Sequence, residues 1–185
     1  MRIALLLLLL TTRAWAADLA TGERLYDAGR WRDAVAELAP LAEQGGAAAQ
    51  FLLGAMLLDG GNGLTRDRVR AVGLLGQAAE QGHAGAMFEL YMAQSGAPEG
   101  LRWAERLVAQ GRRLDGHNRA QAALCAETLG IEQSRGGDAV KARAWLALAV
   151  ELGRQEAQPA LTELDSRLTP EERTRAAALA ATLIR

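Results

Sequence analysis

Small and apolar residues recur along the chain at helical spacing, in a constant register with a series of glycines. A small residue stands eleven positions before each of these glycines, and Ala or Val stands three positions before each; the glycines are Gly45, Gly82, Gly111 and Gly153. Offsets of three and eleven residues return to one face of an α-helix. A glycine at the end of such a face is typical of the left-handed residue that closes a helix. The pattern therefore predicts four helices that end at these glycines.

A second predicted helix precedes each of the last three closing helices. Small and apolar positions alternate over residues 47–54, 84–91 and 120–127, which align in one register. Glycine-rich segments separate the two helices of a unit and predict turns. We therefore expect an all-α chain of tandem helix–turn–helix units, over about residues 18–45, 46–82, 83–111 and 117–153. Together they form a repeat array over residues 17–153, with an irregular third unit.

Residues 154–185 predict two further helices that cover the last open apolar face of the array. Pro159 sets the start of the first helix near Gln158. Thr169 is the expected N-cap of the second helix, because Pro170 and two acidic residues follow it.

The N-terminus has the pattern of a cleavable signal peptide. Arg2 precedes an apolar run over residues 3–10, and alanines at positions 14 and 16 predict cleavage after Ala16. The apolar run is short beside the roughly 20 residues of a spanning helix, so an uncleaved membrane anchor is the weaker alternative. We expect residues 1–16 to be removed. The mature chain is then periplasmic or secreted, without stable membrane insertion.

Charge and reactive residues exclude several functional classes. Removing the signal, with Arg2 and Arg13, leaves 19 basic and 22 acidic side chains, a formal charge of −3. This mildly acidic balance argues against binding to nucleic acid, which requires a basic surface. Cys125 is the only cysteine, and its apolar surroundings favour a buried residue over a reactive thiol. His83 and His117 lie at turns, where a structural role is favoured over catalysis or metal binding. We predict no catalytic residue, metal or cofactor.

Residues 47–60, followed by 70–72 and 78–84, closely resemble the Sel-1-like repeat, a subgroup of tetratricopeptide-like α/α solenoids. Residues 141–149 agree with the same repeat, while Tyr91 stands where the family prefers glycine. The resemblance covers roughly residues 18–153. It implies a right-handed α/α solenoid of about four helix pairs with C-terminal capping helices.

The resemblance also implies that the first helix of each unit lines a concave groove for a protein or peptide partner. The predicted groove residues are Tyr26, Asp27, Phe51, Leu58, Asp59, Phe88, Met92 and Thr128. Apolar anchors with a few acids suit an extended or helical peptide that carries basic residues. For Phe51 and Phe88, packing between helices is the alternative role.

We therefore predict a periplasmic, non-enzymatic adaptor in envelope assembly, polysaccharide export or signalling. The alternatives are a cell-wall-associated enzyme or accessory with a weak hydrolytic site, and a secreted effector that binds host proteins.

Overall fold

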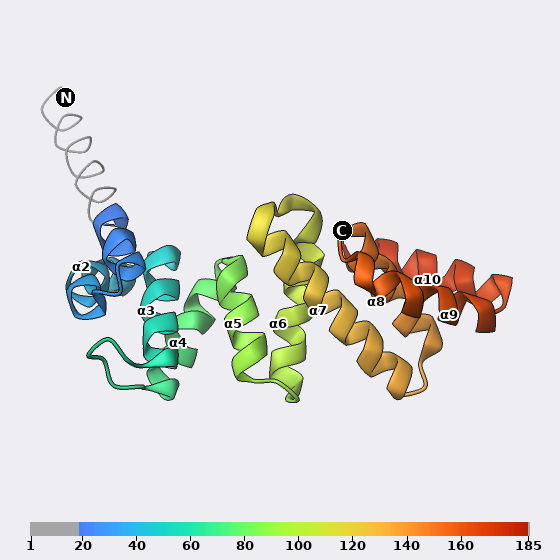
Figure 1. Cartoon of the computed structure of the whole chain (residues 1–185), viewed down its shortest axis with the longest axis horizontal. Helices are drawn as coiled ribbons and strands as arrows, with labels where there is room; N and C mark the ends of the chain where they lie inside the picture. Colours follow the sequence, from blue (N-terminus) through green and yellow to red (C-terminus); the bar gives the residue numbers. More distant parts are fainter. Residues whose placement is uncertain (1–18, 185) are drawn as a thin grey trace, which may run out of the picture. The chain divides into compact units, whose positions relative to one another are not determined.

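A computed structural model describes residues 19–184, and every regular element in that range is helical (Figure 1). The predicted all-α class is confirmed. The predicted signal peptide and its cleavage site at Ala16 lie outside the described residues. No helix in the described range is long and apolar enough to cross a membrane. The chain divides into two compact units, with unit 1 ending at Glu89 and unit 2 beginning at Leu90.

Unit 1 consists of helices that pack around α3. It contains a helical segment over residues 19–27, α2 (Trp31–Glu43), α3 (Ala47–Asp59), α4 (Arg68–Glu80) and the first part of α5 (Ala84–Ala93). Both α2 and α4 pack on α3. Leu38, Met56 and Leu75, one from each of these helices, are fully buried. Because α3 is covered from two sides, its sequence is apolar nearly all round, as expected of a buried helix.

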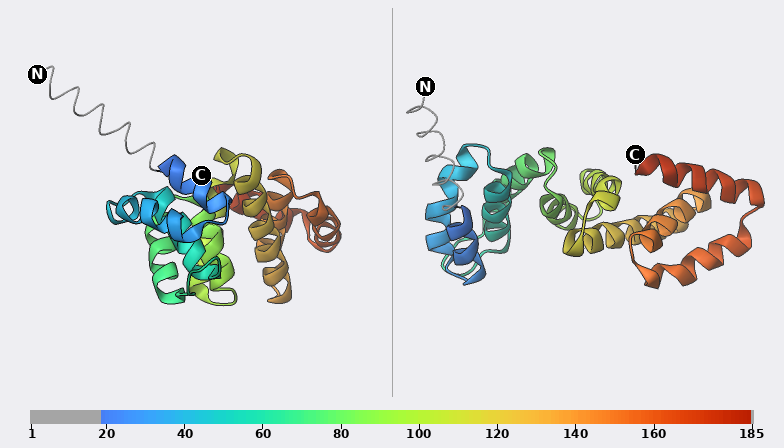
Figure 2. Two further views of the ribbon diagram at one scale, coloured as in Figure 1. Left: turned by 60° about the vertical axis from the view of Figure 1, so that its left-hand side comes forward. Right: turned by 90° about the horizontal axis from the view of Figure 1, so that it is seen from above.

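Unit 2 consists of helices that pack around α7 and α8. After the end of α5 come α6 (Pro98–Gln110), the 3₁₀ turn η1 (Gly111–Arg113), α7 (Gly116–Arg135) and α8 (Ala139–Glu151). The turn η2 (Gln155–Ala157), α9 (Gln158–Arg167) and α10 (Pro170–Leu183) complete it. Helix α8 packs against α7, α9 and α10, and Figure 2 shows it between α9 and α10. Trp103 and Trp145 are buried in this unit.

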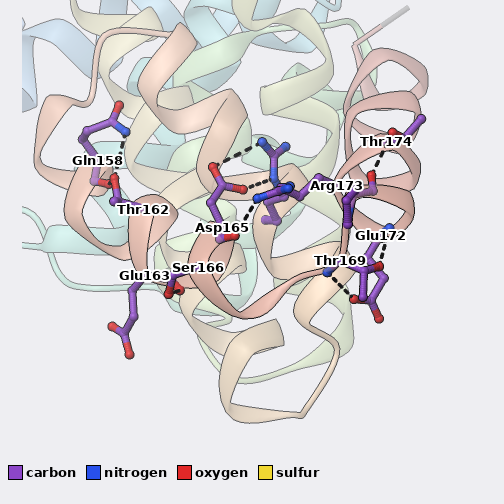
Figure 3. A network of polar contacts seen from close by, with 11 residues as sticks. Gln158, Thr162, Glu163, Asp165, Ser166, Thr169, Glu172, Arg173 and Thr174 are labelled. Carbon is purple, nitrogen blue, oxygen red and sulfur yellow. Dashed lines mark hydrogen bonds and ion pairs between the residues drawn. The ribbon is translucent and has the colours of Figure 1, made fainter.

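The predicted starts of the two C-terminal helices are confirmed. Helix α9 begins at Gln158, and Thr169 caps α10 in a capping box with Glu172 (Figure 3). The Asp165 carboxylate accepts a hydrogen bond from Arg143 of α8 (2.5 Å), and the Asp165 carbonyl accepts one from Arg173 of α10 (3.0 Å). Asp165 of α9 is therefore hydrogen-bonded to both α8 and α10.

Three of the four predicted closing glycines have the expected backbone conformation. Gly45, Gly82 and Gly153 have φ values of 88°, 93° and 113°. The prediction was wrong for Gly111, which has a φ of −51° and begins η1 instead of ending a helix in the left-handed region. Gly111 is buried, and a Cβ there would lie 2.7 Å from Cδ1 of Leu152. Close packing against the end of α8 therefore explains the glycine at this position.

Candidate partner-binding surfaces

A close contact between two helices recurs in both units and fixes the register of the repeats. A Cβ at Gly54 of α3 would lie 2.7 Å from Cγ of Leu75 on α4. A Cβ at Gly130 of α7 would lie 2.7 Å from Cγ of Leu146 on α8. In each case an alanine carbonyl of the same neighbouring helix is also close, at 3.3 and 3.2 Å. Gly54 and Gly130 therefore occupy equivalent positions.

This equivalence corrects the register expected for the fourth unit. The sequence pattern aligns residues 120–127 with 47–54 and so places Glu127 at the position of Gly54. The structure aligns residues 123–130 with that segment, three residues later. The error arose because α7 is alanine-rich over several turns, so small residues match the pattern in more than one register. Only the contact with Leu146 distinguishes the registers.

In the corrected register, two inter-helix contacts of different chemistry occupy equivalent positions in the two units. In unit 1 the Phe51 ring stacks on the His83 ring, with 4.4 Å between centroids. The equivalent positions in unit 2 are Glu127 and Arg154, and the Arg154 Nε donates to the Glu127 carboxylate at 2.7 Å. Phe51 is half-buried and packs against the core around α3. Both pairs join the first helix of a repeat to the turn that follows its second helix, which supports the packing role for Phe51.

Four side chains of unit 1, Tyr26, Asp27, Asp59 and Glu89, interact electrostatically and form what we call the acidic surface. They come from the helical segment 19–27, the end of α3 and the middle of α5. Burial raises the pKa of the Tyr26 phenol, and Asp59, Glu89 and Asp27 raise it further. Burial also raises the pKa of Glu89, with a smaller contribution from Asp59. Asp59 is therefore close enough to disfavour the ionisation of both Tyr26 and Glu89.

Tyr26 is held in place within the acidic surface by its neighbour Trp31. The two rings stack with 5.9 Å between centroids and 5° between planes. The Trp31 Nε1 donates a hydrogen bond to the Tyr26 carbonyl (3.2 Å). Glu89 was absent from the predicted groove residues. Its signal in the sequence was a single acid within the apolar run of residues 86–92.

The other predicted groove residues have different surroundings. Leu58 and Phe88 are half-buried in unit 1. Met92 and Thr128 belong to unit 2, where Met92 is 54% exposed. The Thr128 hydroxyl donates to the Leu124 carbonyl (3.0 Å) and shares a hydrogen bond with Tyr91. Thr128 thus joins α7 to α5, and the corrected register places it at the position of the buried Leu52.

Unit 2 has a cleft of about 200 Å³ between α7, α8 and α9. Its apolar lining includes Ile131, Leu146 and Leu164. Arg135 also lines it, and in the corrected register Arg135 is equivalent to Asp59. The position that carries a carboxylate in the acidic surface of unit 1 therefore carries a guanidinium in unit 2.

The described residues contain no group of three or more His, Cys, Asp or Glu side chains arranged to hold a metal ion. Cys125 is buried among α7 residues, and burial raises the pKa of its thiol to about 12. His83 is half-buried, and its Nδ1 accepts a hydrogen bond from the Ala86 backbone N–H (3.3 Å). This histidine therefore caps the start of α5, in agreement with the structural role expected for it.

Helix pairs with glycine turns and recurring inter-helix contacts define an α-helical repeat protein. The family model described as Sel1 repeat matches residues 47–83 and 119–153. This match confirms the resemblance over these two segments, one of which lies in each unit. Sel1 repeats typically form scaffolds for protein–protein interaction and not catalytic domains.

One solved structure similar to this chain is a protective antigen of uropathogenic Escherichia coli strains that displays an SLR fold. It shares 21% sequence identity with a TM-score of 0.46, over 92% of this chain. This chain spans 45% of the length of that protein. A search of curated proteins finds no match.

Proposed function

We propose that this protein is an exported, non-enzymatic scaffold that binds a partner protein through the acidic surface of unit 1. The observation that carries the proposal is the convergence of Asp59 and Glu89, from two different helices, beside the phenol of Tyr26. Side chains on the first helices of successive repeats are the ones that a partner in the groove would meet. Their charge and aromatic character suit a peptide segment that presents Lys or Arg.

A cation at this surface would relieve an unfavourable arrangement in the free protein. Burial and the neighbouring Asp59 both disfavour the ionised form of Glu89. A basic side chain placed between the two carboxylates favours their ionised forms. Binding should therefore release protons near the raised pKa of Glu89, and it should weaken as the salt concentration rises.

The test begins with the protein that wild-type bait captures from a periplasmic extract. Its affinity is then measured by calorimetry with purified components. The variant Asp59→Asn/Glu89→Gln should weaken binding by about tenfold or more. The control Glu105→Gln/Glu171→Gln removes the same charge from exposed positions of α6 and α10 and should bind like wild type. Equal affinities for all three proteins would exclude the acidic surface as the binding site.

Export is supported by the signal-like sequence over residues 1–16. The protein recovered from the periplasm or the medium should begin at Ala17 when its N-terminus is sequenced. A chain that retains Met1 and stays in the cytoplasm would contradict this part of the proposal. Envelope assembly, polysaccharide export and signalling are the processes in which we expect the partner to act.

A second candidate function is a weak hydrolytic site in a cell-wall-associated enzyme or accessory. The observation in its favour is a half-buried carboxyl with a raised pKa, Glu89, near the exposed Asp59. A general acid and an ionised carboxylate require environments that differ in this way. Turnover of a cell-wall substrate that Glu89→Gln abolishes would favour this function. Absence of turnover in the wild-type protein would reject it.

A further inference from the structure

A cleft of about 420 Å³ lies in unit 1 between α2 and α4, both of which pack on α3. Binding sites for small molecules commonly have roughly 300–1,000 Å³ and an apolar lining with a few polar groups that orient the ligand. The lining of this cleft combines apolar residues with four polar side chains, those of Glu43, Gln50, Arg70 and Gln77. No residue of the acidic surface lines it, so the cleft is a separate candidate site.

A buried amide, that of Gln50, fixes the orientation of the Gln77 side chain in this cleft. Gln50 is 3% exposed, and its Nε2 donates to the Gln77 Oε1 (2.9 Å) and to the Ala42 carbonyl (3.1 Å). The Gln81 Nε2 donates to the Gln50 Oε1 (2.8 Å), so both ends of the buried amide are occupied. The Gln77 oxygen is thus held by Gln50, whereas its Nε2 has no acceptor among the described residues. This NH₂ group is a fixed donor for a ligand in the cleft.

The two charged side chains, Glu43 and Arg70, lie at opposite ends of the cleft. Gln50 joins Ala42 to Gln77, and Glu43 follows Ala42 directly, so Glu43 lies at the Gln77 end. Arg70 lies seven residues before Gln77 on the same face of α4, about 10 Å away along the helix axis. Neither charged side chain has a hydrogen-bond or ion-pair partner among the described residues.

Both charges also stand at helix ends that disfavour them. Glu43 is the last residue of α2, where the helix dipole favours a cation. Arg70 lies in the first turn of α4, where the dipole favours an anion. A ligand with an ammonium group at Glu43 and a carboxylate at Arg70 would match the side chain and the helix dipole at each end of the cleft.

We propose that this cleft binds a short peptide with free termini, its amino group at Glu43 and its carboxylate at Arg70. A single amino acid carries both charges on one carbon and cannot reach both ends. A peptide of about three residues, each spanning at most about 3.5 Å, can do so. The Gln77 NH₂ group then donates to a backbone carbonyl of the peptide. The peptide side chains pack against the apolar part of the lining, which consists of Ala39, Ala42, Leu53 and Leu74.

Titration of the purified, isotope-labelled protein with the peptide Ala-Leu-Ala, followed by NMR, tests the proposal. The side-chain amide signals of Gln77 should shift and saturate below about 10 mM peptide. The N-acetylated peptide lacks the ammonium group and the C-amidated peptide lacks the carboxylate. Each should bind about twofold to fivefold more weakly, because ion pairs at exposed positions contribute modestly. No saturable shift at Gln77, or equal affinities for the free and the blocked peptides, would overturn the proposal.

Variants of the two charged residues test the orientation of the peptide. Glu43→Gln should weaken binding of Ala-Leu-Ala by about twofold to fivefold and leave the affinity for the N-acetylated peptide unchanged. Arg70→Gln should do the same for the free and the C-amidated peptide. Both residues are exposed, so the variants should keep the fold, and the control Arg102→Gln/Glu105→Gln alters exposed charges of α6 and should bind like wild type. Equal losses for the free and the blocked peptide would overturn the assignment.

The peptide cleft and the acidic surface can be tested independently, because they share no residue. Asp59→Asn/Glu89→Gln should bind Ala-Leu-Ala like wild type even where it loses the partner protein. Loss of peptide binding in this variant would place the peptide at the acidic surface and overturn the cleft as its site.

Discussion

Replacing Gly54 by alanine should destabilise unit 1, although alanine is the better helix former. The added Cβ would lie 2.7 Å from Cγ and 3.0 Å from Cδ2 of the fully buried Leu75, and 3.3 Å from the Ala71 carbonyl oxygen. The carbonyl belongs to the backbone of α4, so α3 and α4 would have to move apart. Overpacking of a core typically costs about 1–3 kcal/mol. The gain in helix propensity offsets about 1 kcal/mol of this, and we expect a net loss of up to about 2 kcal/mol.

Gly73→Ala is the matched control on the neighbouring helix. Its Cβ meets no atom within 4 Å, so only the propensity gain remains, and the variant should be more stable than wild type by about 0.5–1 kcal/mol. Urea unfolding followed by circular dichroism would measure both variants. Gly130→Ala should repeat the result of Gly54→Ala in unit 2, because its Cβ meets Leu146 in the same way.

The outcome that refutes the reasoning is a Gly54→Ala protein at least as stable as wild type. A double-mutant cycle identifies the contact responsible for any loss. In a Leu75→Ala background the clashing Cγ is absent and only the 3.3 Å contact with the Ala71 carbonyl remains, so Gly54→Ala should there cost much less than in the wild type. A loss of the same size in both backgrounds would assign the destabilisation to something other than Leu75.

Three further predictions concern single side chains. Burial lowers the pKa of His83 from 6.5, so the unfolded chain binds the proton first, and stability is lost as the pH falls below about 6.5. His83→Asn keeps an acceptor for the Ala86 N–H and should flatten this part of a stability–pH curve; parallel curves for the two proteins would contradict the assignment. The Cys125 thiol, with its pKa raised to about 12, should resist thiol reagents at about pH 8 until urea unfolds the protein. Rapid labelling of the native protein would instead show that the surroundings of Cys125 open to solvent in the folded state. Asp165→Asn weakens the pair with Arg143 and should lower stability by about 1 kcal/mol, with faster amide hydrogen exchange in α9 and α10; unchanged exchange would mean that packing alone holds these helices.

Features that depend on local backbone chemistry could be predicted from the sequence with little error. Thr169 caps α10 as its neighbours Pro170 and Glu172 indicate, because the capping box involves only residues of that turn. Gly45, Gly82 and Gly153 close helices in the left-handed region for the same local reason. Gly111 follows the same sequence pattern, yet its glycine is required by Leu152, which lies 41 residues away in the chain. The sequence pattern alone cannot distinguish a glycine required by a left-handed backbone conformation from a glycine required by a close tertiary contact.

The candidate site was predictable in part. Tyr26, Asp27 and Asp59 were expected in the groove, and the structure brings them together in unit 1. Glu89 was missed because a single acid in an apolar helix has no periodicity to reveal it. Thr128 was expected in the groove from a register that differs by three residues from that of the structure, in which its hydroxyl forms a hydrogen bond with Tyr91.

The sequence by itself determined the all-α class, the repeating helix pairs and most helix ends, since these follow from the spacing of apolar residues and the chemistry of each turn. Tertiary structure decided the register of the fourth unit, because only the contact of Gly130 with Leu146 distinguishes one alanine-rich turn of α7 from the next. It also decided which acids meet at Tyr26, since Asp59 and Glu89 are 30 residues apart in the chain and become neighbours only when α3 and α5 pack.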